Sequence, residues 1–347
     1  MARRRTSTLG ALGIALAAVA VSGATVVATA GAKSGSASAT IKIGLITKTD
    51  TNPFFVKMKE GAQKAAKAAG VTLMTAAGKN DGDNAGQVAA VENMVSAGVK
   101  GIMITPSDTK AIVPTIKKAR AAGVVVIALD TPTEPQSAVD ALYATNNFKA
   151  GVLIGKYAKA VFGSKKAKIA TLDLVPARPT VDVLRHNGFL SGFGVSGISD
   201  KATKFASSSL VVCSADSEGN TAKGQTAMET CLQKNPDINL LYTINEPAAL
   251  GAYTALKAAG KEKQVTIVSV DGGCSGVRGV KAGQITATSQ QYPLKMASQG
   301  LAAIVKYAKT GVKPKGYTDT GVTLITPKPA AGVPSKGIAF GLANCWG

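Results

Sequence analysis

The chain has 347 residues, of which 46% are hydrophobic and 17% are charged, so its composition is that of a folded globular protein and excludes a disordered one. A chain of this length can form about two domains. The formal net charge is +20, but the basic residues are spread along the sequence in short clusters such as Lys165-Lys166, so a nucleic-acid-binding protein is not expected.

The first 32 residues have the pattern of an export signal. Arginines at positions 3 to 5 precede an apolar stretch from Leu9 to Val27, which is followed by small residues with A-x-A spacing. We therefore predict a signal peptide over residues 1–32 and a Gly/Ser/Ala-rich linker over residues 33–40. The protein is then exported, to the periplasm or the cell surface.

Two features of this segment leave alternatives open. An apolar run of this length could also remain uncleaved and anchor the protein in a membrane. The paired arginines leave the Tat export route open beside the Sec route. Lipidation at the signal site is not expected, because Ala24 stands where a lipoprotein signal requires Cys.

The four cysteines indicate disulfides. No C-x-x-C spacing occurs and the only histidine is His186, so a metal site is not expected. An even number of cysteines in an exported protein indicates two disulfides, for which the sequence permits three pairings. We favour Cys213 with Cys231, a strand end with the following helix, and Cys274 with Cys345, which would fix the end of the chain.

From Ile41 onward, short β-branched runs alternate with Ala/Lys-rich helical stretches. Several helical stretches end in Gly, which supplies a left-handed cap. The alternation predicts an α/β fold with parallel sheets covered by helices on both faces, and two halves of five strands predict two similar lobes with a ligand cleft between them. The predicted strands are residues 41–47, 71–76, 101–105, 124–129, 141–145, 167–173, 204–212, 239–244, 265–270 and 285–288.

The first helix carries two adjacent aromatic residues at its start. Asn52 suits the N-cap, Pro53 suits the first helical position and Gly70 ends the helix. Phe55 falls on the apolar stripe of the helix, whereas Phe54 falls to one side of it, at the carboxyl end of the preceding strand, where open α/β sheets bind ligands. We expect the helix start to face a ligand; the alternative is that both rings belong to the core.

Polar side chains follow four of the predicted strands. They are Asp130, then Asn245 and Glu246, then Asp271, then Gln290 and Gln291. Carboxylates and amides can bind the hydroxyl groups of a sugar, and an aromatic face suits the C–H side of its ring. The sequence therefore predicts a small sugar at the carboxyl edges of the sheets.

Three motifs are interpreted as unrelated to function. Gly192–Gly197 matches the dinucleotide motif G-x-G-x-x-G, but it follows a helical stretch instead of a strand. The positions from Asp81 to Glu92 resemble a calcium loop in which Ala85 replaces a ligand. His186 has no partners at the spacing of a catalytic triad and is expected at the surface or near a hinge.

A set of motifs from Ile41 onward resembles the ribose/galactose class of periplasmic solute-binding proteins, which serve sugar ABC importers. The stretches GLITKTDTNPFFVKMKEGA and YTINEPAALGAYTALKAAG look closest to the fructose-import members of that class. The motifs are Thr51–Phe55, Ala128–Thr131, Ile244–Ala252, Val270–Gly273 and Ser289–Pro293.

The resemblance implies the type I periplasmic binding protein fold, in which two Rossmann-like lobes with parallel sheets are joined by three crossings. The crossings are expected at residues 141–148, near Gln291 and near residues 317–322. The expected boundaries are residues 41–143 and 292–320 for the N-terminal lobe, and residues 144–291 and 321–347 for the C-terminal lobe.

The resemblance also implies the ligand-binding residues. Asn52 would bond a hydroxyl, and Phe54 and Phe55 would sandwich the sugar ring. The remaining hydroxyls would be bound by Asp130, Asn245, Asp271 and Gln291.

Four further positions depart from the pattern of the ribose binders. Thr131 stands where they carry Arg, and Lys48 replaces a small hydroxyl residue. Their Arg of the C-terminal lobe aligns near Val183, so Arg178 or Arg185 must take its place. No aromatic residue occurs in the 216–222 loop to stack on the sugar. These departures put ribose in doubt and are compatible with fructose.

As a function, the resemblance implies a monomeric extracytoplasmic protein that captures fructose or a related monosaccharide and delivers it to the membrane permease of an ABC importer, without a cofactor. The alternative is a receptor that presents the sugar to a sensor or chemoreceptor. A sugar-responsive repressor would need a helix-turn-helix module ahead of this fold, and an enzyme would need an acid/base pair or a metal.

Overall fold

The computed structural model describes residues 40–347. The predicted signal peptide over residues 1–32, and the predicted linker except for Thr40, lie outside the described residues. Within residues 40–347, no helix combines the length and apolar character needed to cross a membrane.

The N-terminal lobe is built on a six-stranded sheet in which every pairing is parallel. The strand order is β11-β5-β4-β3-β1-β2. The strands are β1 (Lys42–Thr47), β2 (Thr72–Ala77), β3 (Gly101–Ile104), β4 (Val125–Leu129), β5 (Ala141–Ala144) and β11 (Gly316–Asp319).

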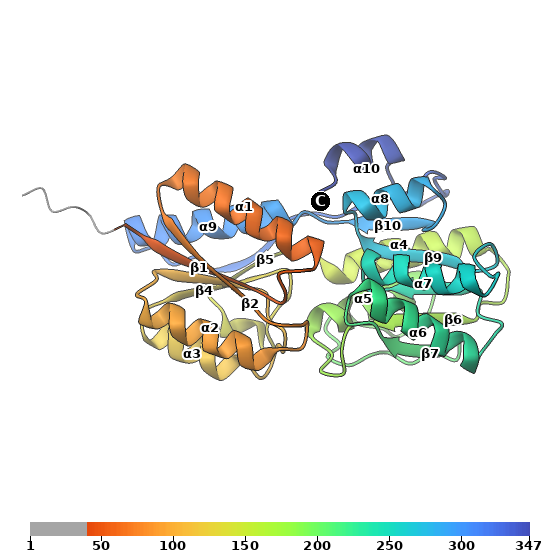
Figure 1. Cartoon of the computed structure of the whole chain (residues 1–347), viewed down its shortest axis with the longest axis horizontal. Coiled ribbons are helices and arrows are strands. Elements are labelled where there is room, and N and C mark those ends of the chain that lie inside the picture. Colours follow the sequence, from red (N-terminus) through yellow and green to blue (C-terminus); the bar gives the residue numbers. More distant parts are fainter. Residues whose placement is uncertain (1–39) are drawn as a thin grey trace, which may run out of the picture. The chain divides into compact units, whose positions relative to one another are not determined.

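Helices cover both faces of this sheet, as a parallel sheet requires. On one face α1 (Pro53–Ala69) and α9 (Pro293–Thr310) pack on β1, β3 and β4, and on the other face α2 (Asn84–Ser96) and α3 (Val113–Ala121) pack on the same sheet (Figure 1). The central strands β1, β3 and β4 are therefore buried between two apolar layers, whereas the edge strand β11 is exposed. The 3₁₀ helix η1 (Gln136–Ala138) precedes β5.

The C-terminal lobe is built on a second six-stranded sheet with the order β12-β10-β9-β8-β6-β7. All of its pairings are parallel except that of β12 with β10, which is antiparallel, so this sheet departs at one edge from the predicted all-parallel arrangement. The strands are β6 (Ile169–Asp173), β7 (Val211–Asp216), β8 (Leu240–Thr243), β9 (Thr266–Asp271), β10 (Ala287–Gln290) and β12 (Thr323–Ile325).

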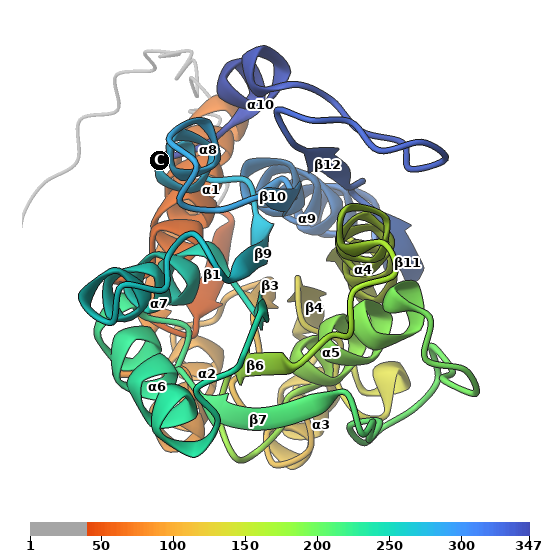
Figure 2. The ribbon, with the colours of Figure 1, turned by 90° about the vertical axis from the view of Figure 1, so that its right-hand side faces the viewer.

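Helices also cover both faces of the second sheet. The helices α4 (Asn147–Phe162) and α5 (Thr180–Phe193) lie on one face, and α6 (Thr221–Lys234) and α7 (Glu246–Ala258) lie on the other (Figure 2). Two shorter helices complete the lobe, α8 (Cys274–Lys281) and α10 (Ile338–Asn344).

The chain passes between the two sheets three times: after β5, after β10, and between β11 and β12. The predicted fold class, two α/β lobes joined by three crossings, is confirmed. Neither lobe is made of one continuous stretch of chain. The residue boundaries of the lobes stay a prediction.

The start of α1 has the predicted capping. The Oδ1 of Asn52 accepts the N–H of Phe54 at 3.0 Å, Pro53 is the first helical residue, and Gly70 ends the helix with a φ of 65°. Because Pro has no N–H to leave unsatisfied in the first turn, this sequence fixes where the helix begins.

The strand predicted at residues 204–212 is wrong in position, since β7 begins only at Val211. The side chain of Asn187 takes the backbone groups of the preceding residues: its Nδ2 donates to the carbonyl of Lys204, and its Oδ1 accepts the N–H of Ala206. A side chain of α5 thus occupies the groups that a sheet would pair. The predictions also placed β10 two residues early and omitted β11 and β12.

Glycines allow α4 and α5 to pack with their backbones in contact. A Cβ at Gly151 would lie 2.3 Å from the carbonyl oxygen of Arg185, and a Cβ at Gly192 would lie 2.3 Å from that of Val152. Gly194, with a φ of 109°, ends α5. The G-x-G-x-x-G pattern therefore reflects helix packing and capping, consistent with its exclusion as a dinucleotide site.

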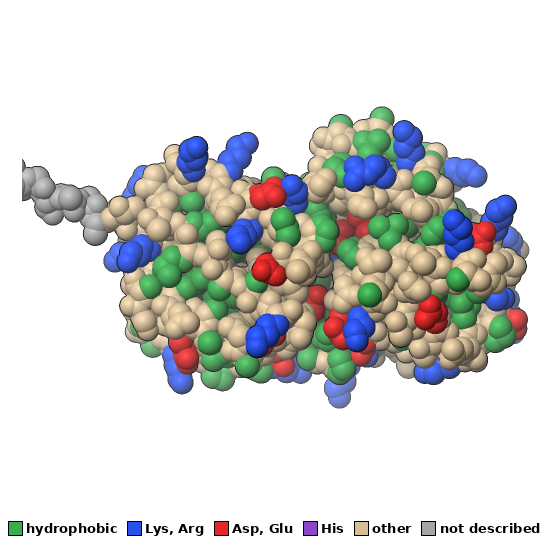
Figure 3. All heavy atoms as spheres, viewed as in Figure 1, with side chains coloured by type: hydrophobic (Ala, Val, Ile, Leu, Met, Phe, Trp, Pro, Cys, Tyr) green, Lys and Arg blue, Asp and Glu red, His purple; other side chains and the backbone are tan. Residues whose placement is uncertain are grey.

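The structure contains the disulfides Cys213–Cys231 and Cys274–Cys345, the pairing favoured from the sequence. The first joins β7 to α6 and the second joins the start of α8 to the residue after α10. On the face drawn in Figure 3, Lys and Arg side chains are scattered among other residues and do not form one continuous basic patch.

Candidate functional site

A small cavity lies between the carboxyl edges of the two sheets. Both lobes contribute to its lining. The lining residues are Lys48, Asn52, Phe54, Phe55, Asp81, Asp130, Leu174, Val181, Arg185, Ile244, Asn245, Asp271 and Gln291.

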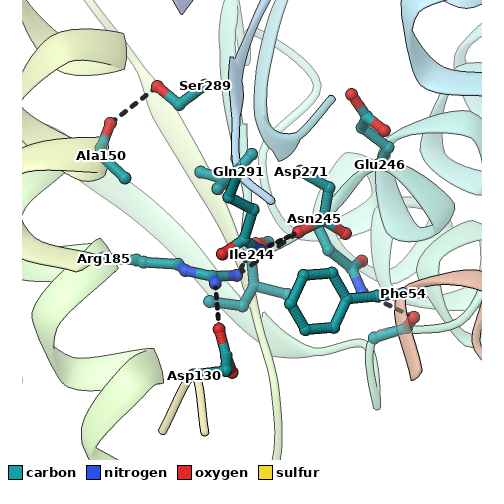
Figure 4. A network of polar contacts seen from close by, with 12 residues as sticks. Phe54, Asp130, Ala150, Arg185, Ile244, Asn245, Glu246, Asp271, Ser289 and Gln291 are labelled. Carbon is teal, nitrogen blue, oxygen red and sulfur yellow. Dashed lines mark hydrogen bonds and ion pairs between the residues drawn. The ribbon is translucent and has the colours of Figure 1, made fainter. Parts of the chain in front are cut away.

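Arg185 is the central charged group of the cavity. Its guanidinium donates to the Oδ1 of Asp130 at 3.1 Å and lies 3.7 Å from the Oδ1 of Asp271 (Figure 4). It also donates to the Oδ1 of Asn147 at 2.8 Å and to the carbonyl of Ile244 at 3.2 Å. Arg185 belongs to α5 and Asp130 follows β4, so this ion pair joins the two lobes.

Two further hydrogen bonds hold Asp130, one from the adjacent Thr131 and one from Asn147 at the start of α4. The hydroxyl of Thr131 donates to the Oδ2 of Asp130 at 2.9 Å, and the Nδ2 of Asn147 donates to its carbonyl at 2.8 Å. Thr131 is fully buried and does not line the cavity. It therefore orients Asp130 and does not itself face the empty space.

Gln291 and Asp271 form a second polar pair. The Nε2 of Gln291 donates to the Oδ1 of Asp271 at 2.7 Å. The Oε1 of Gln291 is buried and has no hydrogen-bond partner among residues 40–347. A buried carbonyl oxygen without a partner is costly, so this atom is a ready acceptor for a ligand hydroxyl.

Asn52 and Asn245 have the same structural role in the two lobes. Each is an N-cap: the Oδ1 of Asn52 accepts from Phe54 and the Oδ1 of Asn245 accepts from Ala248 at 3.2 Å. The Nδ2 of Asn245 donates to the carbonyl of Gly219 at 2.8 Å. The capping bonds fix both amides at the rim of the cavity, at the starts of α1 and α7.

The two phenylalanines do not form the expected sandwich. Their ring centroids are 5.4 Å apart at an interplanar angle of 82°, so the rings contact each other edge to face and leave no gap for a sugar between them. Both rings are at most 5% exposed and belong to the core of the N-terminal lobe while also lining the cavity. The ligand and core interpretations of these residues are thus compatible.

Aliphatic side chains line the cavity from the C-terminal lobe. Leu174, Val181 and Ile244 form a small buried cluster there. They supply the apolar surface for which the sequence offered no aromatic residue in the 216–222 loop.

Lys48 and Asp81 bring a second pair of opposite charges to the cavity. The Nζ of Lys48 lies 4.0 Å from the Oδ1 of Asp81, and both side chains are almost fully buried. Burial raises the pKa of Asp81 to about 6, although the charge of Lys48 acts in the opposite direction.

Burial also raises the pKa of two neighbouring carboxyls. The pKa of Asp271 is raised to about 7, with the nearby Arg185 opposing the shift. The pKa of Glu246 is raised to about 8, first by burial and then by the charge of Asp271. Glu246 accepts the N–H groups of Gly272 and Gly273 at 2.8 and 2.9 Å, so it fixes the turn that follows Asp271.

Both aspartates of the central cluster have an uncommon backbone conformation. The φ angles of Asp130 and Asp271 are 61° and 137°, a region that side chains other than Gly rarely adopt. Such conformations persist only where the surroundings enforce them, and they concentrate at functional sites.

The structure decides between the two candidate arginines and corrects the expected surface position of His186. Arg178 does not line the cavity; its guanidinium pairs with the carboxylate of Asp216 and lies over the ring of Phe205. Arg185 is the arginine that reaches the cavity. His186 is buried and not at the surface, with its Nδ1 2.9 Å from the Oδ1 of Asp173 and its ring stacked on Phe205.

Sequence reasoning missed several lining residues. Asp81 lies four residues beyond the end of β2. It could have been recognised as a candidate, because it follows a strand of the N-terminal sheet in the same way as Asp130 does. Leu174 directly follows β6. Val181 and Ile244 are apolar and gave no signal, since an apolar residue at a strand end or in a helix is expected in the core.

Comparisons with known proteins agree with this architecture. Residues 43–312 match the family model described as periplasmic binding protein domain. The ribose import binding protein of Bacillus subtilis (strain 168) is 33% identical over 251 residues, which cover 72% of this chain and 76% of that protein.

Two solved structures illustrate the structural likeness. An ABC transporter solute-binding protein from Agrobacterium vitis with bound D-fucose is 28% identical, with a TM-score of 0.72 and coverage of 85% of this chain and 100% of that one. One from Actinobacillus succinogenes 130z with bound D-allose is 25% identical, with a TM-score of 0.71 and coverage of 82% and 97%. The chain belongs to the periplasmic binding protein family of sugar ABC transporters, whose members are exported substrate-binding proteins and not enzymes.

Proposed function

We propose that this protein captures one monosaccharide in the cavity between its lobes and delivers it to the membrane permease of an ABC importer. The observation that carries the proposal is the position of Arg185, which lies between Asp130 of one lobe and Asp271 of the other. A polyol at this place can receive hydrogen bonds from the guanidinium and donate to both carboxylates.

Most of the lining residues have a role in this proposal. Asp130, Asp271 and the Oε1 of Gln291 accept from sugar hydroxyls, while Arg185 and Lys48 donate to them. Phe54 and Phe55 cover the C–H groups of the ring from one side. Leu174, Val181 and Ile244 cover them from the other.

The strength of such a site is sufficient for a transport protein. Neutral hydrogen bonds contribute about 0.5–1.5 kcal/mol each and bonds to charged groups about 1.5–3 kcal/mol. Six or seven of them, less the cost of closure and of lost ligand freedom, leave about 8 kcal/mol, which is a dissociation constant near 1 μM.

Fructose is the first sugar to test. The stretches around Asn52 and Asn245 look closest to fructose-import binding proteins, and Thr131 replaces the arginine of the ribose binders. The relatives described above bind other sugars, namely ribose, D-allose and D-fucose. We also propose that residues 1–32 form a cleaved signal peptide and that the exported protein is a monomer.

Titration calorimetry tests the proposal directly. We expect one D-fructose per chain with a micromolar dissociation constant, and we expect Asp271→Asn and Phe54→Ala each to weaken binding about 10- to 100-fold, because charged and apolar contacts of this kind are worth about 1.5–3 kcal/mol. Asp237→Asn is the matched control, since Asp237 pairs with Lys168 on the surface and its side chain is 70% exposed.

Three outcomes are distinguishable. If D-ribose, D-allose or D-fucose binds and D-fructose does not, the fructose proposal is wrong and the monosaccharide function stands. If none of the four binds, the function itself is wrong.

Delivery is tested by uptake of the labelled sugar in cells that lack the protein: the wild type should restore uptake, and unchanged uptake despite tight binding would favour the receptor role.

A further inference from the structure

A disulfide and a backbone bridge attach residues 345–347 to the C-terminal lobe. Cys345 forms a disulfide with Cys274, the first residue of α8. The next residue, Trp346, forms a parallel bridge with Gly273, and its carbonyl accepts the N–H of Cys274 at 2.9 Å. The segment is therefore attached two to three residues after Asp271, the last residue of β9.

The side chain of Trp346 belongs to the other lobe. It is 6% exposed and packs within the core cluster of the N-terminal lobe, where its ring meets that of Phe54 edge to face at 5.3 Å and 74°. Its Nε1 donates to the carbonyl of Gln291 at 2.8 Å. One residue thus contacts α1, the crossing after β10 and the turn after β9.

Trp346 does not line the ligand cavity itself. It lines a neighbouring cavity, and Asn52, Phe54 and Asp271 line both. Trp346 therefore lies behind Phe54 as seen from the ligand cavity. Both residues that it touches through its ring and its N–H, Phe54 and Gln291, face that cavity.

We propose that Trp346 is a positioning residue for the ligand, which fixes the Phe54 ring and the backbone of Gln291, and that the Cys274–Cys345 disulfide holds Trp346 in place. The proposal rests on the proposed sugar-binding function. The contact between Trp346 and Phe54 joins an element of one lobe to an element of the other, so it also stabilises the arrangement in which the lobes enclose the cavity.

A disulfide that served only overall stability would make a different prediction. It would lower the free energy of unfolding when removed and leave ligand affinity unchanged in the folded protein. Ligand affinity of folded variants therefore separates the two roles.

A double-mutant cycle tests the coupling between the two rings. Trp346→Ala, Phe54→Leu and the double variant are titrated with the tightest binder among D-fructose, D-ribose, D-allose and D-fucose, at a temperature where thermal unfolding shows every variant to be folded. Trp346→Ala should weaken binding about tenfold in the wild-type background and only about threefold in the Phe54→Leu background, where the bond to Gln291 is lost but the contact with the Phe54 ring is already absent. Trp346→Phe, which keeps a ring and loses the N–H, should weaken binding about two- to tenfold.

The two disulfides provide a matched comparison. The pair Cys274→Ser with Cys345→Ser should weaken binding about three- to tenfold, in line with loss of an aromatic contact worth about 0.5–1.5 kcal/mol. The pair Cys213→Ser with Cys231→Ser should lower thermal stability and leave affinity within about twofold, since this disulfide joins β7 to α6 and neither cysteine lines the cavity.

The results separate this proposal from the proposed function. If a sugar binds the wild type but Trp346→Ala has the same effect in both backgrounds, or both cysteine pairs change affinity equally, the positioning role is wrong and the sugar-binding function stands. If none of the four sugars binds the wild type, the proposed function fails and this proposal fails with it.

Discussion

Protonation of Asp271 should control ligand affinity near neutral pH. Burial raises its pKa to about 7, and the charged groups that face it are Arg185, Asp130, Asp81 and Glu246. An ionised carboxylate accepts hydrogen bonds from sugar hydroxyls with both oxygens, whereas the neutral acid gives up one of these acceptor positions to its own proton. Affinity should therefore rise between about pH 5.5 and 8 as the carboxyl ionises.

The stability of the ligand-free protein should change in the opposite direction. The native pKa of Asp271 lies above its ordinary value of 3.8, so its contribution is fully present below pH 3.8 and is lost as the pH rises through about 7. Titration calorimetry and urea unfolding at several pH values measure the two trends. Asp271→Asn should weaken the pH dependence of both affinity and stability, and Asp237→Asn should change neither. If the pH dependence is unchanged in Asp271→Asn, the titrating group is Asp81 or Glu246.

At the scale of helices, close packing of α4 on α5 positions Arg185. A Cβ at Gly151 would lie 2.3 Å from the carbonyl oxygen of Arg185, so Gly151→Ala must displace α5 at the residue that lines the cavity. Gly192→Ala creates the same overlap with Val152 near the end of α5, away from the cavity. We expect each to lower the free energy of unfolding by about 1–3 kcal/mol, and Gly151→Ala alone to weaken sugar binding about tenfold.

Urea unfolding and titration calorimetry check this prediction. Gly279→Ala in α8 is the control, because its Cβ would meet only side-chain atoms at 3.2 Å or more, so it should change stability by less than about 1 kcal/mol. Equal loss of affinity in Gly151→Ala and Gly192→Ala would show that ligand affinity depends on the position of the whole of α5 and not on the helical turn that contains Arg185.

Helices and strands whose ends are marked by capping residues in the sequence could be predicted. Those whose conformation depends on contacts with residues distant in sequence could not. Asn52, Pro53 and Gly70 define α1 through their own capping chemistry. The stretch expected to begin a strand at residue 204 is instead irregular up to Val211. There the side chain of Asn187, a residue of α5, hydrogen-bonds the backbone of Lys204 and Ala206. No local pattern carries that information.

The candidate site divides in the same way. Asp130, Asn245, Asp271 and Gln291 could be predicted because the carboxyl ends of parallel strands meet at one edge of a sheet. The choice between Arg178 and Arg185 could not, since it depends on Asp216 attracting Arg178 at the end of β7. The contact of Phe54 with Trp346 could not be predicted either, because Trp346 is distant in sequence.

At the scale of the whole described chain, the ligand should make the two lobes unfold together. The late strands β11 and β12 complete the edges of different sheets, so neither lobe can unfold without disturbing the crossings. The Arg185–Asp130 pair and the proposed sugar both join the lobes through a buried site. A ligand that contacts both lobes stabilises only the state in which both are folded.

Differential scanning calorimetry with and without sugar tests this coupling. At a sugar concentration about 100 times the dissociation constant, the native state should gain about 2.7 kcal/mol, seen as one transition moved to higher temperature. Arg185→Met should remove most of the gain, because it takes away a donor to the sugar and leaves Asp130 and Asp271 without their shared cation. Two separate transitions in saturating sugar, only one of them shifted, would mean that the ligand is held by a single lobe.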